Sequence, residues 1–140
     1  MSPRDTSTGA VLEAMILPAL RNGGYTHQTQ INIGQRIGGR RHMVDVLAEK
    51  DGEHFPISLK WQQVSGTAEQ KIPFEVICLA EAVVQSQSKF TKAYLVLGGE
   101  GWSLRDFYTQ GGLEKHLEYA DAVDILTLEG FVARANQGKL

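Results

Sequence analysis

The sequence holds a single cysteine, Cys78, among its 140 residues. One thiol per chain excludes an internal disulfide, and it excludes a zinc site built from the cysteines of one chain. Because Cys78 lies in an apolar helical stretch, we expect it to be a small buried hydrophobic side chain. The chain also lacks repeats, low-complexity tracts and any apolar run of membrane-spanning length, so we expect no membrane partner.

The chain has no surplus of basic residues, since 14 Lys and Arg face 16 Asp and Glu and give a formal net charge of −2. This balance argues mildly against a nucleic-acid ligand, because such ligands usually bind a basic surface. The positive charges are unevenly spread, however, and Arg36, Arg40 and Arg41 cluster among glycines. A local basic patch of this kind can serve an acidic protein. The N-terminus has no apolar secretory core, which favours a cytoplasmic location.

The length and composition fit one soluble globular domain, and we expect residues 1–140 to form a single domain. Hydrophobic periodicity and turn residues predict the order α-β-β-β-α-β-α-β-α, an α/β fold with a mixed central β-sheet flanked by helices. We expect helices over residues 8–22, 66–86, 104–108, 113–119 and 129–136, and strands over residues 26–33, 43–49, 54–61, 93–99 and 121–128.

Two of the predicted helices carry candidate cap or kink signals. Thr8 is a possible N-cap of the first helix, and Pro18 is a possible kink within it. Ser65 or Thr67 could cap the helix that follows residue 66, and Pro73 either starts its regular part or bends it.

The most informative segment is a predicted β-hairpin with Asp51 and Gly52 as its turn, because Asp-Gly supplies the positive φ angles of a tight turn. With these two residues as the loop, Asp45 lies opposite Ser58 and Lys60 lies on the diagonal. Side chains alternate along a strand, so one face of the hairpin is expected to carry Asp45, Ser58, Lys60 and Gln62. The opposite, apolar face is expected to carry Val44, Val46, Ile57, Leu59 and Trp61.

An Asp on a strand beside a Lys is most often an ordinary cross-strand ion pair. Here Ser58, Lys60 and Gln62 alternate on one strand, a turn of small residues follows, and the next helix carries Glu75. Together these features favour a nuclease over a simple ion pair.

Asp45 on one strand, Ser58 and Lys60 on the next, and Glu75 on the following helix resemble the PD-(D/E)xK nuclease superfamily. The resemblance runs from the first helix to the strand that begins at Ala93, and it implies a restriction-endonuclease-like core. The sequence departs from the family pattern at Val44, where the pattern has proline, and at Ser58, where it has an acid. A branch of the superfamily has Ser-x-Lys at this site and takes its second carboxylate from the following helix.

The resemblance implies a Mg2+ site, with Mn2+ able to substitute. Asp45 would be the central ligand, and either Glu75 or Glu69 would supply the second carboxylate. The Leu59 carbonyl could add a third oxygen, and Glu13 on the first helix is a candidate outer ligand.

The catalytic set implied by the resemblance adds Lys60 and Gln62. Lys60 would orient the attacking water or stabilise the scissile phosphate, and Gln62 would orient the nucleophile or a phosphate. The candidate DNA-backbone contacts are Arg36, Arg40, Arg41 and Lys71.

The expected function is a Mg2+-dependent DNA endonuclease, sequence-specific and of the restriction or homing type. It would act on double-stranded DNA as a homodimer or homotetramer, because one active site cuts one strand. Two alternatives stay open. One is a Holliday-junction resolvase or DNA repair nuclease. The other is a catalytically inactive DNA-binding module on a nuclease scaffold, in which activity was lost when Ser58 replaced the acid of the family pattern.

Overall fold

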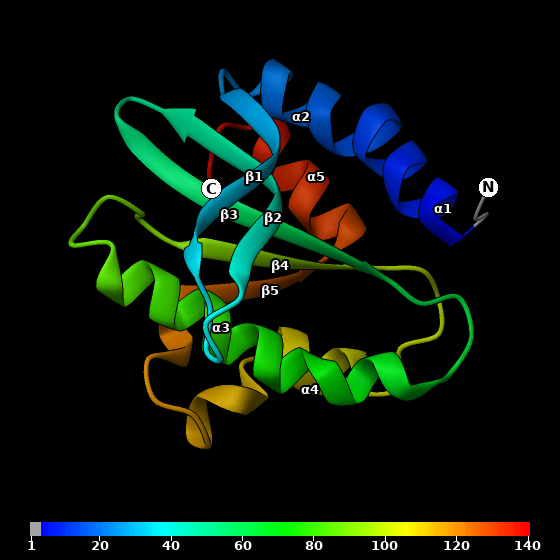
Figure 1. Ribbon diagram of the computed structural model, residues 1–140. Helices are drawn as coiled ribbons and strands as arrows, with labels where there is room; N and C mark the ends of the chain where they lie inside the picture. Colours follow the sequence, from blue (N-terminus) through cyan, green and yellow to red (C-terminus); the bar gives the residue numbers. More distant parts are fainter. Residues whose placement is uncertain (1–3) are drawn as a thin grey trace.

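Five strands form one mixed sheet in the order β1-β2-β3-β4-β5, with helices on both faces (Figure 1). The computed structural model describes residues 4–140, and the side chains of residues 8–140. β1, β2 and β3 pair antiparallel, whereas β3, β4 and β5 pair parallel. The α/β fold with a mixed sheet, predicted from the sequence, is therefore confirmed. The strands are β1 (Thr26–Gln35), β2 (Arg41–Lys50), β3 (Glu53–Trp61), β4 (Ala93–Gly98) and β5 (Val123–Thr127).

Two hydrophobic cores lie on the two faces of the sheet. The helices are α1 (Arg4–Val11), α2 (Leu17–Asn22), α3 (Ile72–Gln85), α4 (Arg105–Thr109) and α5 (Leu128–Asn136). α2 and α5 cover the first core, and α3 covers the second. Alternate residues of β4 enter the two cores, since Tyr94 and Val96 lie in the first and Leu95 and Leu97 in the second. Burial on both sides explains why β4 reads as an uninterrupted apolar run.

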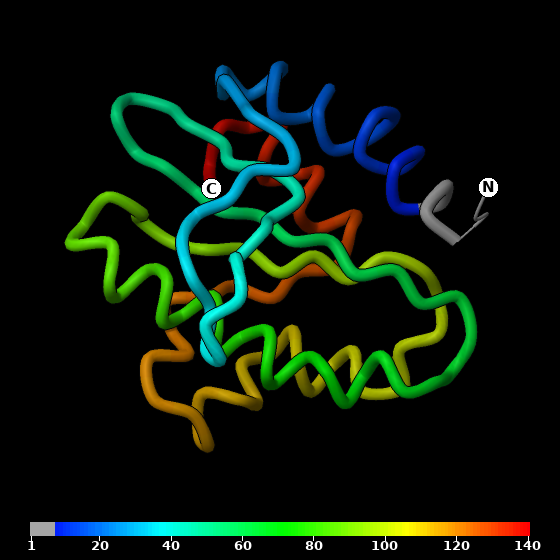
Figure 2. Tube along the Cα trace, in the orientation of Figure 1, coloured from blue at the N-terminus to red at the C-terminus, as the bar shows by residue number. Residues whose placement is uncertain are grey.

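α2 and α5, which come from opposite ends of the sequence, lie side by side in the first helical layer (Figure 2). The Asn22 side-chain amide donates to the Asn136 side chain at 3.1 Å, and the Leu140 N–H donates to the Tyr25 hydroxyl at 2.9 Å. Across residues 4–140 no helix combines the length and the apolar character needed to cross a bilayer.

The first helix departs from its predicted form at both of its signals. It begins at Arg4, so Thr8 lies inside α1 and the predicted N-cap is wrong. A π-helical turn (Leu12–Ile16) separates α1 from α2. Pro18 has no N–H and its ring crowds the carbonyl four residues earlier, so a wider turn just before it relieves both problems.

The hairpin follows the predicted register. Asp51 and Gly52 have φ angles of 55° and 80°, and Val46 pairs with Ile57 across β2 and β3. The predicted apolar face is wrong in one position, because Val44 packs in the second core while Val46 packs in the first. The β1–β2 pair is therefore twisted so strongly that Val44 and Val46, two positions apart, point to opposite faces of the sheet. Figure 1 shows this twist.

Two other predicted helices differ from the structure. The segment before α3 is a 3-10 turn (Thr67–Lys71), and no side-chain cap forms at its start, so the predicted caps at Ser65 and Thr67 are wrong. Pro73 lies in the first turn of α3 and begins its regular part. The helix predicted over residues 113–119 is replaced by one 3-10 turn (Gly112–Lys115), and a second 3-10 turn (Ala120–Ala122) follows it.

The loop after β4 packs closely on the chain that follows β3. Gly101 N–H donates to the Gln62 carbonyl at 2.8 Å, and the Gln62 side chain donates back to the Gly101 carbonyl at 2.7 Å. A Cβ atom on Gly101 would lie 2.5 Å from the Val64 carbonyl carbon, which is closer than such atoms approach. Gly101 is therefore required by the close approach of two backbone segments.

Gly101→Ala is expected to lower the free energy of unfolding by about 2 kcal/mol, because an overpacked position typically costs about 1–3 kcal/mol. Urea denaturation measures the change. Gly9→Ala is the matched control, since an added Cβ meets nothing within 4 Å at that helical position. The control should leave stability unchanged or raise it by up to about 1 kcal/mol. Equal stability of both variants would contradict the close approach.

Candidate active site

Asp45 lies where the β2–β3 ladder ends. Val46 and Ile57 form the last backbone pair of that ladder, and beyond it the Leu59 N–H donates to Asp45 Oδ2 at 2.7 Å. Partial burial raises the pKa of the Asp45 carboxyl, and the Leu59 N–H and the charge of Lys60 only partly offset this rise. A cation at the free oxygen of Asp45 would stabilise the ionised carboxylate, because an opposite charge favours the ionised form.

Gln30 on β1 stands at the register position opposite Asp45, between the pairs formed by Thr29 and Ile31. Its φ angle of 49° is left-handed, which is uncommon for a residue other than glycine. The Gln30 side chain donates a hydrogen bond to Asp45 and lowers the pKa of that carboxyl. The strong twist of the β1–β2 pair thus occurs beside the Asp45 carboxylate. Residues held in uncommon backbone conformations cluster at functional sites.

Glu75 on α3 faces two cations. Its Oε1 accepts a hydrogen bond from Arg36 Nη2 at 2.9 Å, and its Oε2 lies 3.9 Å from Lys60 Nζ. The charge of Glu75 also raises the pKa of Asp45, so the two carboxylates interact electrostatically. The Glu75 side chain is 14% exposed and the Lys60 side chain 40%. The structure therefore brings Asp45, Lys60 and Glu75 together at a site that opens to solvent.

Ser58 and Lys60 extend from the face of β3 that carries α3. They pair with Leu95 and Leu97 of β4, which belong to the second core, whereas Leu59 between them packs in the first core. Ser58 is 4% exposed. Ser58 stands at the position where the PD-(D/E)xK pattern has an acid.

Glu69 is committed to a different set of contacts. Both of its carboxylate oxygens accept from the Ser103 hydroxyl at 2.9 Å, and Oε1 also accepts from the Ser103 N–H. The Gln62 amide lies 3.4 Å from the same oxygen, and the Tyr108 hydroxyl donates to the Glu69 carbonyl at 2.7 Å. Glu69 and Gln62 are both buried and together fasten the loop after β4.

The remaining candidate residues lie on several other parts of the chain. Glu13 is exposed on the π-helical turn, in the helical layer on the opposite face of the sheet. Lys71 is exposed in the 3-10 turn before α3, and Arg40 and Arg41 are exposed where β2 begins. Arg36, in the loop between β1 and β2, contacts Glu75 directly.

His42 is a buried residue near the site that the sequence patterns did not single out. It is 1% exposed, and neither ring nitrogen has a hydrogen-bond partner among the described residues. Burial, followed by the charge of Arg36, lowers the pKa of His42, so its imidazole is neutral at pH 7. The alternation of buried residues along β2 places His42 on the side of Val44, and that alternation was the available sequence signal.

The donor atoms at this site suit a hard divalent cation. Asp45 and Glu75 offer carboxylate oxygens from facing elements, and oxygen ligands are those that Mg2+ prefers. Within the described part of the chain no group of three or more His, Cys, Asp or Glu side chains could enclose a metal ion. Mg2+ usually keeps several waters and takes one or two carboxylates together with substrate phosphates, so two carboxylates fit this ion.

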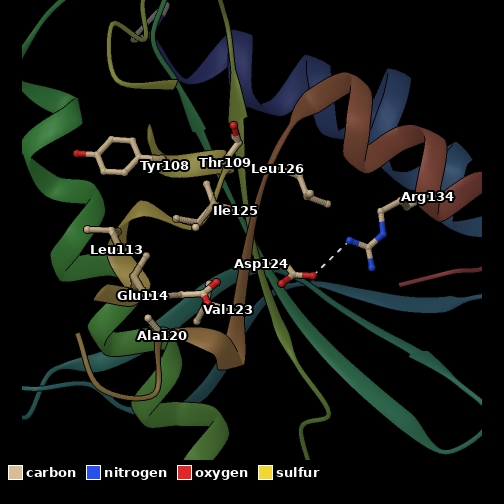
Figure 3. Close-up of a pocket in the computed structure, with 12 residues that line it drawn as sticks. Tyr108, Thr109, Leu113, Glu114, Ala120, Val123, Asp124, Ile125, Leu126 and Arg134 are labelled. Atoms are coloured by element: carbon tan, nitrogen blue, oxygen red, sulfur yellow. Dashed lines mark hydrogen bonds and ion pairs between the residues drawn. The ribbon is translucent and has the colours of Figure 1, made fainter. Parts of the chain in front are cut away.

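A separate cavity of about 240 Å³ lies beside β5 (Figure 3). Its lining includes Asp124 and Arg134, whose Oδ2 and Nη1 atoms are 3.2 Å apart. Asp124 also accepts a hydrogen bond from Lys92 at 3.1 Å. None of the candidate residues lines this cavity, and the Asp124–Arg134 ion pair holds β5 to α5 at the edge of the sheet.

Comparison with known proteins supports a family assignment. The family model described as "PD-(D/E)XK nuclease superfamily domain" matches residues 4–139. No curated protein sequence matches the chain.

A solved structure shares the fold. It is a crystal structure of a protein of unknown function, AF1548, with a TM-score of 0.50 and 14% sequence identity. The match covers 80% of this chain and 54% of that chain, so the present sequence spans about half the length of its structural relative. The five-stranded mixed sheet flanked by helices, together with the family match over residues 4–139, confirms the predicted restriction-endonuclease-like core.

Proposed function

The chain belongs to the PD-(D/E)XK nuclease superfamily, and from this premise we propose that it is a Mg2+-dependent endonuclease that hydrolyses phosphodiester bonds in double-stranded DNA. The observation that carries the proposal is the convergence of Asp45, Lys60 and Glu75. These residues come from β2, β3 and α3, and Lys60 Nζ lies 3.9 Å from Glu75 Oε2. A carboxylate pair beside a partly exposed amine is suited to hydrolysis of a phosphodiester.

Each side chain has a distinct task in this proposal. Asp45 and Glu75 would hold the cation, with the Leu59 carbonyl as a further oxygen. When bound, Mg2+ or Mn2+ would activate water and neutralise charge that develops on the phosphate. The Leu59 N–H keeps the Asp45 carboxylate in place through its 2.7 Å hydrogen bond. Lys60 is partly exposed and would position the attacking water or the scissile phosphate.

The substrate proposal rests on exposure and charge. Lys60 is 40% exposed, so a large ligand can reach the site. Arg40, Arg41 and Lys71 are exposed cations that would contact backbone phosphates. We propose cleavage of the restriction or homing type by a homodimer or homotetramer, since one site cuts one strand of a duplex.

Cleavage assays test the proposal. Supercoiled plasmid DNA and a four-way DNA junction are incubated with the protein and Mg2+, with Mn2+, or with EDTA. Discrete plasmid fragments that depend on the metal are the expected result. Selective cutting of the junction would instead support a resolvase, and DNA binding without any cutting would support an inactive binding module.

Arg40→Gln and Arg41→Gln are expected to weaken duplex DNA binding about equally for all sequences, because phosphate contacts carry no base information. Each substitution should reduce the slope of log affinity against log salt by about 1. Fluorescence anisotropy across a salt series measures both quantities. Lys139→Gln is the control: it removes an exposed charge near the C-terminal end of the described chain, and it should change neither the affinity nor the salt slope. Unaltered salt slopes in both arginine variants would show that Arg40 and Arg41 do not contact the DNA backbone.

A further inference from the structure

The Glu75 carboxylate lies between two protein cations. Arg36 Nη2 lies 2.9 Å from Glu75 Oε1, and both side chains are largely shielded, at 23% and 14% exposure. Lys60 lies near the other oxygen at 3.9 Å. Both oxygens of the proposed second metal ligand therefore face protein cations, and Arg36 makes the shorter contact.

Several contacts hold the Arg36 guanidinium in this position. It lies 5.2 Å from the centre of the Phe74 ring, and Nη2 also donates to Cys78 Sγ at 3.4 Å. Phe74 and Cys78 flank Glu75 on α3, so the Arg36 guanidinium contacts three side chains of one helix. These contacts together fix the position of the guanidinium, so the Arg36–Glu75 ion pair is more than a surface contact.

The same short loop carries the exposed arginines. Arg36 N–H donates to the Arg40 carbonyl at 2.8 Å, and Gly39 N–H donates to the Arg36 carbonyl at 2.9 Å. Gly38 and Gly39 have φ angles of 97° and 87°, a conformation that glycine adopts without strain. A phosphate bound at Arg40 would thus lie on the loop whose other end holds Glu75.

Metal binding and the Arg36 contact compete for one carboxylate. A divalent cation shared with Asp45 needs an oxygen of Glu75, while Arg36 already neutralises that charge. Arginine binds phosphate oxygens through the same planar fork with which it binds a carboxylate. A substrate phosphate can therefore replace Glu75 as the partner of Arg36.

We propose that Arg36 couples metal binding to nucleic-acid binding. Without nucleic acid, Arg36 occupies Glu75 and keeps the affinity for a divalent cation low. A backbone phosphate draws the guanidinium away and frees Glu75 for the cation. This inference rests on the proposed function above, and it makes Arg36 a positioning residue that acts through Glu75.

Mn2+ binding to the full chain, measured by electron paramagnetic resonance, tests the coupling without any cleavage step. Arg36→Gln is expected to bind Mn2+ roughly tenfold more tightly than the wild type in the absence of DNA, within the usual range of coupling between sites. Adding a phosphorothioate DNA duplex should tighten Mn2+ binding to the wild type and add little in the variant. Should Arg36→Gln unfold, Arg36→Lys carries the same test with a smaller increase.

Arg105→Gln is the control, because it removes one exposed positive charge from α4 and should leave Mn2+ affinity unchanged. Unchanged or weaker Mn2+ binding in Arg36→Gln would overturn the coupling and make Arg36 a support of the ligand. If the wild type binds Mn2+ through Asp45 while Arg36→Gln equals the wild type, only this inference fails. If no variant binds Mn2+ with or without DNA, the proposed function fails with it.

Discussion

Asp45→Asn is expected to abolish metal-dependent DNA cleavage while the protein stays folded. Asn keeps the size of the side chain and an oxygen that can accept the Leu59 N–H, which now lies 2.7 Å from Oδ2. It loses the negative charge that would bind the cation. Loss of about 4 kcal/mol of metal-derived stabilisation corresponds to a rate about a thousandfold lower. Plasmid cleavage under single-turnover conditions measures the loss.

The stability of the same variant separates a functional from a structural carboxylate. The pKa of Asp45 is raised, chiefly by burial, so the folded state holds this proton more tightly than the unfolded state. The Asp45 contribution to the free energy of unfolding therefore falls as pH rises from the unfolded pKa through the raised folded one. Asp45→Asn lacks this decrease, and at pH 7 it should melt at the wild-type temperature or above.

Asp106→Asn provides the control for this experiment, because Asp106 is an exposed carboxylate on α4. It should cut plasmid at the wild-type rate. An Asp45→Asn protein that cuts normally would remove Asp45 from the chemistry. An Asp45→Asn protein that unfolds at pH 7 would make Asp45 a structural residue.

Glu75→Gln and Glu69→Ala are expected to have opposite effects. Glu75→Gln should lose metal binding and cleavage, because it removes the second carboxylate near Lys60. Glu69→Ala should retain cleavage per folded molecule and lose about 2–3 kcal/mol of stability, since Ser103 and Gln62 lose a charged acceptor. Thermal melting and cleavage rates on the same preparations separate the two roles.

The reverse outcome would assign the site differently. If Glu69→Ala folds well and loses cleavage while Glu75→Gln cuts normally, Glu69 is the metal ligand. The loop after β4, which Glu69 fastens through Ser103, would then belong to the active site.

The parts of the fold that follow from local patterns were predictable. Asp51 and Gly52 set the hairpin turn, and the turn set the register that pairs Val46 with Ile57. The apolar run of β4 was recognisable because both faces of a central parallel strand are buried. Helix ends were less predictable, as at Thr8, because a cap depends on where the helix begins.

The site could be predicted only as a set of residues, since its contacts join distant parts of the chain. Arg36 reaches Glu75 across 39 positions, and Ser103 reaches Glu69 across 34. No local pattern distinguishes Glu69 from Glu75, because both are acids near the start of one helical segment. The left-handed conformation of Gln30 likewise arises from the tertiary twist of β1 and β2, and it has no signal in the sequence.

Crystals grown with Mn2+ and a phosphorothioate DNA duplex test most directly whether Asp45 and Glu75 bind one divalent cation together. Anomalous scattering at the manganese edge locates the ion independently of any assumed ligands. A manganese peak is expected between the Asp45 and Glu75 carboxylates, with the Arg36 guanidinium moved away from Glu75. A manganese peak at Glu69, at Glu13 or at Asp124, with none at Asp45, would contradict this expectation.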